Sequence, residues 1–577
     1  MTDFSTALPT DDEIRQHLNY MANCPTLAID TEGSLTHPHS ETWGLSYSDG
    51  IHQQYYPFNH ISGDNLDSSW IEALRRVIES HPRVVMHHAK HDIRALRNLG
   101  INLRGRPWYC TMLMSHMTNE NLFAQSLDAV SRFYGGPGKA QSEEMERIIK
   151  WLGWRYVPSW MFMDYAGNDA HITHPIFETI WPDFVAQGFN GELWDIERQF
   201  TWLLADMEDN GTLIDKELSE RELTRGLKVM GDIEYELGFN PGSTTQLGEF
   251  LIGVLRLPVV KRSKKTNKPS FDKFAMEVYD ELLERNNDSR AKRILEYRGW
   301  SKTTSSNYRP YLELADSKDG RLRANYKQHG TKTGRLSCEK PNLQQIPRQS
   351  AKDWNGQLKR AFIVDQGRTR YEFDYGQLEL RLAAAVSKSQ GLIDIFADDS
   401  RDVFQEMAVE LGMTRSDTKT LNYTIQYGGG LDRLVAVFGV SRSAARAIRE
   451  NYFAKFPGLE KVTRRAAALV EKQGYIEYWT GRRRHFWRPR EEAHKAFNSW
   501  CQGGAFEIVK RRMLALWYAG LLNDECKLDI QVHDSVGLDI QNGKEHIYVP
   551  EVKRVMEAVE PDFGVHFKVD DHKWGEN

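Results

Sequence analysis

Two aspartates that lie far apart in the chain each follow a stretch typical of a β-strand. Asp374 lies near the end of the predicted strand Thr369–Tyr375, and a helical pattern follows it. Asp534 lies between two apolar runs, Leu528–Val532 and Val536–Ile540, which predict a hairpin. Carboxylates at a strand end and at a hairpin tip can converge on metal ions without burying unpaired charge. The pattern therefore predicts a strand and a hairpin that each carry an aspartate at an end.

A predicted helix between these two segments carries side chains suited to an anionic ligand. Four of them fall on one helical face at spacings of four, three and one residues: Arg415, Lys419, Asn422 and Tyr423. Thr414 is a suitable N-cap, which places Arg415 at the positive end of the helix, where phosphate is favoured. Taken alone, an ordinary amphipathic surface helix explains this pattern equally well.

Four acidic residues and a tyrosine in the first third of the chain form a second candidate site: Asp30, Glu32, Asp92, Tyr165 and Asp169. Asp30 and Glu32 fall on the same side of a predicted strand, because strand side chains alternate. Asp92 starts a predicted helix, and Tyr165 lies one helical turn before Asp169. Such carboxylates can hold two Mg²⁺ ions roughly 3.5–4 Å apart for phosphodiester hydrolysis, and the tyrosine can orient the attacking water. Each pattern alone is common among surface residues.

The order of these motifs resembles that of family A DNA polymerases of the bacterial DNA polymerase I large-fragment type. Three segments are similar to the family's motifs A, B and C: Tyr371–Arg381, Arg415–Gly428 and Val532–Asp534. Thr333–Ser337 with Pro341–Pro347 is similar to the segment that contacts the primer–template minor groove. The acids of the first third are similar to the three motifs of the proofreading exonuclease. The resemblance runs from about residue 25 to the end of the chain.

The resemblance implies template-directed DNA synthesis from dNTPs on a primed template, with 3′→5′ exonucleolytic proofreading. Both sites would use two Mg²⁺ ions, with Mn²⁺ as a substitute. The implied polymerase metal ligands are Asp374, Asp534 and the backbone carbonyl of Tyr375. The implied exonuclease ligands are Asp30, Glu32, Asp92 and Asp169, with Tyr165 as a further catalytic residue.

The same resemblance implies residues that contact the nucleotide and the DNA. The nucleotide-binding set is Gln377, Glu379, Arg415, Lys419 and Tyr423. Arg415 and Lys419 would neutralise the triphosphate, and Tyr423 would stack on the incoming base and sugar. Glu379 would be the steric gate against a ribose 2′-OH. The DNA-binding set is Arg335, Asn342, Gln345, Arg381, Gln502 and His533.

Three positions depart from the family pattern. His88 stands where the second exonuclease motif usually has Asn, and Asp92 of that motif is retained. Ser535 stands where a Glu usually follows the motif C aspartate, which predicts activity with altered metal handling. Phe404 replaces a His that usually contacts the triphosphate, so Arg415 and Lys419 would carry more of the charge stabilisation.

The expected fold class is an α/β 3′→5′ exonuclease domain plus an α+β right-hand polymerase domain. The expected boundaries are 1–190 for the exonuclease, 191–345 for a helical thumb and 346–577 for palm and fingers, with fingers at about 400–495. No 5′-nuclease domain is expected, because the first nuclease acid is already at position 30. No long thumb insertion of the kind that recruits a thioredoxin processivity factor is expected either. This compact build resembles a bacteriophage replicative polymerase, with an organelle or bacterial origin left open.

Composition limits the kind of protein that this chain can be, but it does not identify the protein. The formal net charge is −5, so attraction to DNA would come from local basic runs such as Val260–Lys268, Gly481–Arg490 and Lys510–Arg512. The five cysteines form no Cys-x-x-Cys pair, which makes a zinc site or a disulfide framework unexpected. We find no secretion signal and no apolar run near the roughly 20 residues that span a bilayer. The expected protein is a cytoplasmic monomer without membrane contact, which binds primer–template DNA, dNTPs and replisome proteins such as a helicase-primase and a single-strand binding protein.

Two other functions compete with this interpretation. A single-subunit RNA polymerase shares the palm, but Glu379 and the exonuclease acids argue against it. A catalytically dead DNA-binding accessory protein is disfavoured because Asp374, Asp534 and the four nuclease acids are all present. Primer extension with dNTPs against rNTPs separates the first alternative from a DNA polymerase.

Overall fold

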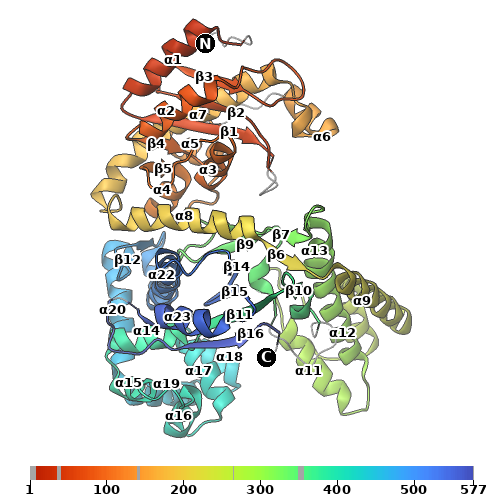
Figure 1. Cartoon of the computed structure of the whole chain (residues 1–577). Coiled ribbons are helices and arrows are strands. Elements are labelled where there is room, and N and C mark those ends of the chain that lie inside the picture. Colours follow the sequence, from red (N-terminus) through yellow and green to blue (C-terminus); the bar gives the residue numbers. More distant parts are fainter. Residues whose placement is uncertain are drawn as a thin grey trace.

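The computed structural model describes residues 8–34, 40–138, 143–263, 265–347, 357–559 and 561–575. An N-terminal domain lies above a long helix, α8 (Glu192–Asn210), and the rest of the chain lies below that helix (Figure 1). In this view the predicted thumb helices extend to the right and the predicted fingers helices lie at the lower left. The described residues contain no helix long and apolar enough to cross a membrane.

The N-terminal domain is built on a mixed five-stranded sheet in the order β3-β2-β1-β4-β5. The strands are β1 (Leu27–Gly33), β2 (Thr42–Ser48), β3 (Gln53–Pro57), β4 (Val84–Met86) and β5 (Trp108–Cys110). β1 runs antiparallel to β2 and parallel to β4. The apolar start of β1 is buried in the domain core, so the strand delivers Asp30 and Glu32 to the edge of that core.

Seven α-helices surround this sheet among the described residues: α1 (Asp11–Asn23), α2 (Trp70–Ser80), α3 (Ala89–Asn98), α4 (Thr111–Thr118), α5 (Leu127–Phe133), α6 (Glu143–Leu152) and α7 (Ser159–Ala186). The long helix α7 packs against β1, β2 and β3. α3 follows β4 and packs on β1. The predicted strand–helix alternation of this domain is confirmed, and it places the start of α3 and the middle of α7 beside β1.

The palm contains a four-stranded antiparallel sheet in the order β14-β15-β11-β16. The strands are β11 (Arg368–Tyr375), β14 (Cys526–Val532), β15 (Ser535–Gln541) and β16 (Val569–Lys573). Helices α14 (Leu378–Ser387), α22 (Ala496–Tyr518) and α23 (Glu545–Glu557) accompany the sheet. The predicted strand ending near Asp374 and the predicted hairpin at Asp534 are both confirmed, and they are neighbours in one sheet.

The thumb has its own small core, formed by helices α9 to α12 and the segments between them. The thumb helices are α9 (Lys216–Leu237), α10 (Thr244–Gly248), α11 (Lys273–Glu284), α12 (Arg290–Thr303) and α13 (Arg309–Leu314). This core is narrower than the predicted thumb, 191–345. The C-terminal half of α8 and residues from about Tyr308 onward pack into the palm core instead. There, the short strands β6 (Thr212–Ile214), β7 (Arg321–Leu322) and β10 (Phe362–Ile363) form one sheet, and β8 (Asn325–Lys327) pairs with β9 (Ser337–Glu339).

The fingers are helical and share a core that runs from α14 to the start of α22. Their elements are α15 (Gln390–Phe396), α16 (Val403–Leu411), α17 (Arg415–Gln426), α18 (Leu431–Phe438), α19 (Arg442–Lys455), α20 (Pro457–Gln473), α21 (Pro489–Glu492) and the hairpin of β12 (Tyr475–Glu477) and β13 (Arg483–His485). α17 begins directly after Thr414, whose hydroxyl accepts a hydrogen bond from the Asp417 N–H. The predicted cap and helix are confirmed.

Candidate active sites

The two palm aspartates lie on adjacent strands at one end of the sheet. Asp374 on β11 is opposite Ser535 on β15, and the Tyr375 N–H donates to the backbone carbonyl of Asp534 over 3.4 Å. His533, at the hairpin tip, has a positive φ of 53°, which is uncommon for a residue other than glycine. The tight turn therefore carries Asp534 beside Asp374, as the strand pattern predicts. His533 itself is exposed.

A guanidinium joins the second palm aspartate to the predicted steric gate. The Arg335 Nη2 atom lies 2.7 Å from Asp534 Oδ1 and 3.1 Å from Glu379 Oε1. Burial raises the pKa of Glu379 above its ordinary value, and Arg335 opposes that rise. The second Glu379 oxygen is buried and has no hydrogen-bond partner among the described residues. Arg335, predicted to contact DNA, thus also holds two carboxylates of the palm site in place.

A further carboxylate lies near the palm aspartates and was not predicted. Glu372 precedes Asp374 by two residues on β11, so both side chains leave the same face of the sheet. Glu372 Oε2 is 2.6 Å from Lys359 Nζ and 3.0 Å from His572 Nε2. Burial alone would raise the pKa of Glu372, but the hydrogen bonds from His572 and Lys359 outweigh it and lower the pKa to about 2. Only the period-two spacing of Glu372 and Asp374 signalled this residue in the sequence.

The predicted triphosphate-binding helix presents its charges to solvent. The Arg415 guanidinium forms two hydrogen bonds with Asp402 Oδ2, at 2.9 and 2.7 Å, and both side chains are exposed. The Lys419 ammonium lies 5.8 Å from the ring centre of Phe404, which is buried. Tyr423 is half-buried, tilted against Phe404 and stacked on Tyr427. The three predicted nucleotide-binding residues therefore share one accessible face of α17.

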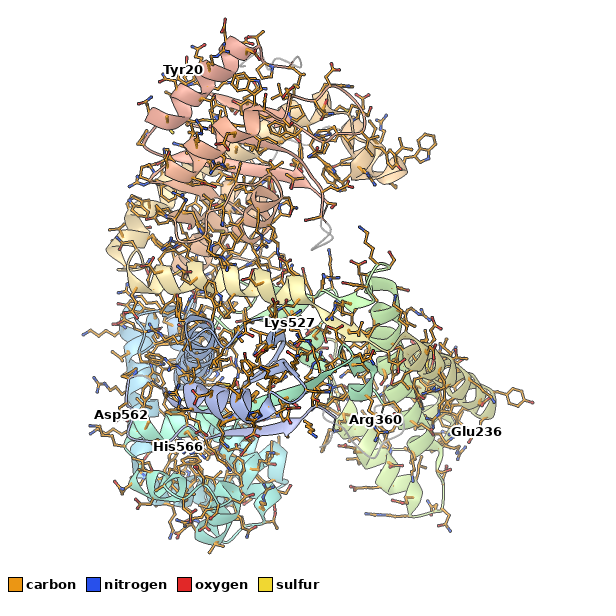
Figure 2. All side chains as sticks on the ribbon, viewed as in Figure 1. Tyr20, Glu236, Arg360, Lys527, Asp562 and His566 are labelled. Carbon is orange, nitrogen blue, oxygen red and sulfur yellow. The ribbon has the colours of Figure 1, made fainter. Side chains whose placement is uncertain are left out.

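Asn422, on the predicted face of α17, and Arg381, a predicted DNA contact, are both held by partners within the protein. The Asn422 side chain is buried and accepts a hydrogen bond from the Tyr452 hydroxyl over 2.7 Å. Arg381 is 5% exposed and donates to the carbonyls of Gly376 and His566, the latter labelled in Figure 2. We therefore revise the predicted DNA contact of Arg381, because its guanidinium is held inside the palm.

The other predicted DNA and nucleotide contacts come from separate elements of the chain. Gln377 has a φ of 58° and precedes α14, while Gln502 is half-buried on α22. Asn342 caps a short helical turn through the Gln344 N–H, and the neighbouring Gln345 is exposed. The Gln344 side chain, which was not predicted, donates to Gln531 over 2.7 Å and joins this segment to β14.

The N-terminal acids form a compact carboxylate cluster. Asp30, Glu32 and Asp169 each offer an oxygen, and these atoms lie within 4.8 Å of one another. Asp92 is outside this group; its Oδ1 accepts hydrogen bonds from the Thr31 N–H and hydroxyl, at 3.2 and 2.7 Å. The other Asp92 oxygen is buried without a hydrogen-bond partner among the described residues. Three hard oxygen donors and a buried acceptor beside them fit divalent cations such as Mg²⁺.

Tyr165 lies one turn before Asp169 on α7, as predicted. Its ring is 5.9 Å from Trp154 and 6.2 Å from Phe162, measured between centroids. This aromatic packing holds the ring one helical turn before Asp169. His88, the residue in place of the usual Asn, is exposed and stacks on His91, with 6.1 Å between centroids.

Two arginines of the basic run Gly481–Arg490 join separate parts of the chain. Arg482 is buried and pairs with Glu197 on α8 and with Glu507 on α22. Arg484 is buried and pairs with Glu120, which belongs to the N-terminal domain. These two arginines are therefore committed to protein partners, and the local attraction to DNA expected of this run does not come from them.

Sequence and structure comparisons agree with this two-site architecture. A family model described as "DNA polymerase family A" matches residues 216–577, and a "3'-5' exonuclease" model matches residues 6–184. DNA polymerase I of Pseudomonas aeruginosa is 30% identical over 583 residues, which cover 94% of this chain and 62% of that protein. The thermostable DNA polymerase I of Thermus aquaticus is 29% identical over 433 residues, which cover 70% of this chain and 50% of that protein. The chain thus spans less than two thirds of the length of these relatives.

A solved structure shares the fold along nearly the whole chain. The POL domain of Pol1 from M. smegmatis, in complex with DNA primer-template and dNTP, superposes with a TM-score of 0.84 at 22% sequence identity. The match covers 98% of each chain. The predicted fold class is confirmed by this likeness and by the sheets described above. With the family model covering the thumb, palm and fingers, the chain belongs to DNA polymerase family A.

Proposed function

We propose that this chain extends a DNA primer on a template from dNTPs and removes 3′-terminal nucleotides at a second site. The observation that carries the proposal is the pair of separate acidic centres. Asp374 and Asp534 are neighbours in the palm sheet, while Asp30, Glu32 and Asp169 cluster in the other domain. Two acidic centres in one chain are suited to two different phosphodiester reactions.

In the palm, Asp374 and Asp534 are the residues that would hold divalent ions, proposed to be Mg²⁺. Bound there, the ions would favour ionisation of the primer 3′-OH and stabilise the leaving pyrophosphate. Arg415 and Lys419 would bind the triphosphate at the N-terminal end of α17, where Arg415 exchanges Asp402 for phosphate. Glu379 would lie against the sugar and exclude a 2′-OH.

In the exonuclease domain, Asp30, Glu32 and Asp169 would hold the ions, with Asp92 and its buried oxygen beside them. Tyr165, fixed by Trp154 and Phe162, would orient the attacking water. Primer–template DNA and dNTPs are the proposed substrates. Replisome proteins as partners and a monomeric state remain predictions.

The test is to inactivate each centre separately in the full chain. Asp374→Ala should abolish primer extension and leave degradation of a labelled single strand at the wild-type rate. Asp30→Ala with Glu32→Ala should do the reverse. Asp562→Ala changes an exposed acid of the polymerase domain and is the matched control. Loss of both activities in either variant, with unfolding curves unchanged, would contradict the two-centre assignment.

A further inference from the structure

A groove of about 1410 Å³ lies between the exonuclease domain and the polymerase part of the chain. On one side it is lined by the start of α3 and by the loop between α4 and α5. On the other side it is lined by the end of α13 and by the segment around β8 and β9. The groove therefore has one wall from each enzymatic half.

The groove is lined by residues that neighbour both active sites in the chain. At α3 it reaches His91, whose Nδ1 lies 3.7 Å from Asp92 Oδ1 in the exonuclease site. On the opposite wall it reaches Gly330–Lys332 and Ser337, which flank the segment that carries Arg335. Since Arg335 contacts Asp534 and Glu379, the same groove adjoins the segments that support both catalytic centres.

One aromatic side chain stands out on the groove wall. Phe123, in the loop between α4 and α5, lines the groove, and its side chain is fully exposed, at 104% of the reference area. The loop around it is firmly attached. Glu120 is buried and pairs with Arg484, and the Asn121 amide donates to the His485 carbonyl over 2.9 Å. On the other side of Phe123, the Gln125 carbonyl lies 3.0 Å from His87 Nε2. A rigid loop thus presents a solvated aromatic ring to the groove.

The charge of the groove suits a polyanion. Eight lysine and arginine side chains line it, against five aspartate and glutamate side chains. Four of these five acids form ion pairs with basic residues: Glu120, Glu208, Asp316 and Glu339. Five of the eight basic side chains are themselves paired with carboxylates. The surplus positive charge therefore comes from Lys318, Lys332 and Lys340 on the polymerase wall, which form no ion pair among the described residues. Such a surface attracts a phosphate backbone.

We propose that Phe123 stacks on an unpaired base of a DNA single strand that lies in this groove and leads to the exonuclease carboxylates. The inference rests on the proposed exonuclease function and adds a base-binding residue to it. A duplex keeps its bases stacked on each other and offers phosphates to its surroundings, so an isolated exposed ring suits an unpaired base. Stacking on an aromatic face tolerates every base, as the removal of arbitrary terminal nucleotides requires.

The first experiment compares wild type with Phe123→Ala, in the full chain, on two substrates. One is a labelled single-stranded oligonucleotide, and the other is the p-nitrophenyl ester of thymidine 5′-monophosphate, which is too small to reach the groove wall. For the oligonucleotide, KM should rise about 5- to 100-fold in the variant, as expected for the loss of one stacked base. Hydrolysis of the ester should be unchanged. Phe123→Trp should keep the wild-type KM.

The matched control is Phe133→Ala, which removes another exposed ring of the same domain that does not line the groove. This variant should degrade the oligonucleotide like wild type. An unchanged KM in Phe123→Ala would overturn the proposal. Equal losses on the oligonucleotide and the ester would also overturn it, because the substitution would then act on the metal site.

A second measurement reports binding without hydrolysis. Oligonucleotides with 2-aminopurine at successive positions near the 3′ end are bound in EDTA, and fluorescence quenching by stacking is recorded. One position should be quenched by wild type and not by Phe123→Ala. If wild type quenches that position but degrades no strand, the proposed exonuclease function fails while the stacking role stands. If no position depends on Phe123, the groove wall serves another ligand, such as a protein partner, and the proposal fails.

Discussion

The Ser535 hydroxyl lies 3.1 Å from Glu372 Oε1, across the strand pair that carries Asp374 and Asp534, and 3.0 Å from the Val532 carbonyl, the other acceptor for its one proton. Ser535 is the residue that replaces the family's usual Glu after motif C. The structure thus brings a carboxylate from β11 to the place next to this serine, held by Lys359 and His572. A serine with one donor and a neighbouring glutamate form a complementary pair, whereas two glutamates would not.

This relationship predicts that restoring the usual residue will harm the enzyme. Ser535→Glu should place two carboxylates side by side in a poorly solvated site and lower extension efficiency by roughly tenfold, with a higher Mg²⁺ requirement. Extension is measured across a Mg²⁺ titration. Adding Glu372→Gln to Ser535→Glu should recover much of the loss, and Glu372→Gln alone is the control. Full activity of the single Ser535→Glu variant would show that the two side chains do not interact.

Glu379→Ala should admit ribonucleotides. The side chain is 13% exposed, and Arg335 holds one of its oxygens at 3.1 Å, so it occupies a fixed volume. Removing it should reduce the preference for dNTPs over rNTPs by at least about tenfold, measured as a ratio of incorporation efficiencies. Glu379→Gln keeps the volume and loses the charge, so it should retain most of the selectivity. If both variants keep the wild-type ratio, Glu379 is not the gate.

Tyr423→Phe should raise discrimination against dideoxynucleotides by roughly one to two orders of magnitude. A dideoxynucleotide lacks the 3′-OH that can bond within the triphosphate, which costs ~1–3 kcal/mol, and the Tyr423 hydroxyl can donate in its place. The ring itself is held between Phe404 and Tyr427, so deleting the hydroxyl should preserve stacking and normal extension. Incorporation ratios are measured in an exonuclease-deficient background. Tyr427→Phe removes a neighbouring hydroxyl and should leave the ratio unchanged.

Glu197→Gln should destabilise the junction between α8 and the palm by about 3–5 kcal/mol, because Lys510 and Arg482 lose a buried partner. Burial would raise the pKa of Glu197, but these two cations outweigh it and hold the pKa below its ordinary value of 4.5. The carboxylate therefore stabilises the folded state above pH 4.5, and this contribution is lost as the pH falls below that value.

Urea unfolding from pH 8 to pH 3.5 measures this contribution. The stability difference between wild type and Glu197→Gln should be constant down to about pH 5 and shrink at lower pH. Glu192→Gln, which removes an exposed carboxylate from the same helix, should cost less than about 1 kcal/mol. A difference that grows as the pH falls would contradict the direction of the Glu197 pKa shift.

Local sequence patterns predicted the parts of the sites that depend on local structure. The strand at Asp374, the hairpin at Asp534 and the capped helix at Arg415 follow from side-chain period and capping, and all three are confirmed. The convergence of Asp30, Glu32 and Asp169 followed from the family's motif order, since no local rule brings β1 and α7 together.

The residue roles that the sequence did not predict depend on partners from distant segments of the chain. Arg482, Arg484 and Arg381 look like surface charges in the sequence, but their carboxylate or carbonyl partners lie up to 364 positions away. Glu372 looks like an ordinary strand residue until Lys359, His572 and Ser535 surround it. Charge alone does not reveal whether a basic residue meets phosphate or a buried acid, because the answer depends on tertiary contacts.

Helix α8 belongs to two hydrophobic cores at once. Its Leu193, Trp194 and Trp202 pack into the exonuclease core, while Phe200, Leu203, Leu204 and Met207 pack into the palm core. The two enzymatic halves therefore have no dispensable linker at which they can be parted. A polymerase half expressed alone must keep α8 and will expose its tryptophans to water, which favours aggregation. An exonuclease half grafted onto another polymerase brings α8 with it, and the palm-facing side of α8 must then fit the new palm. We therefore expect exchange of exonuclease domains to succeed only when α8 is exchanged together with the segments that it contacts in both cores.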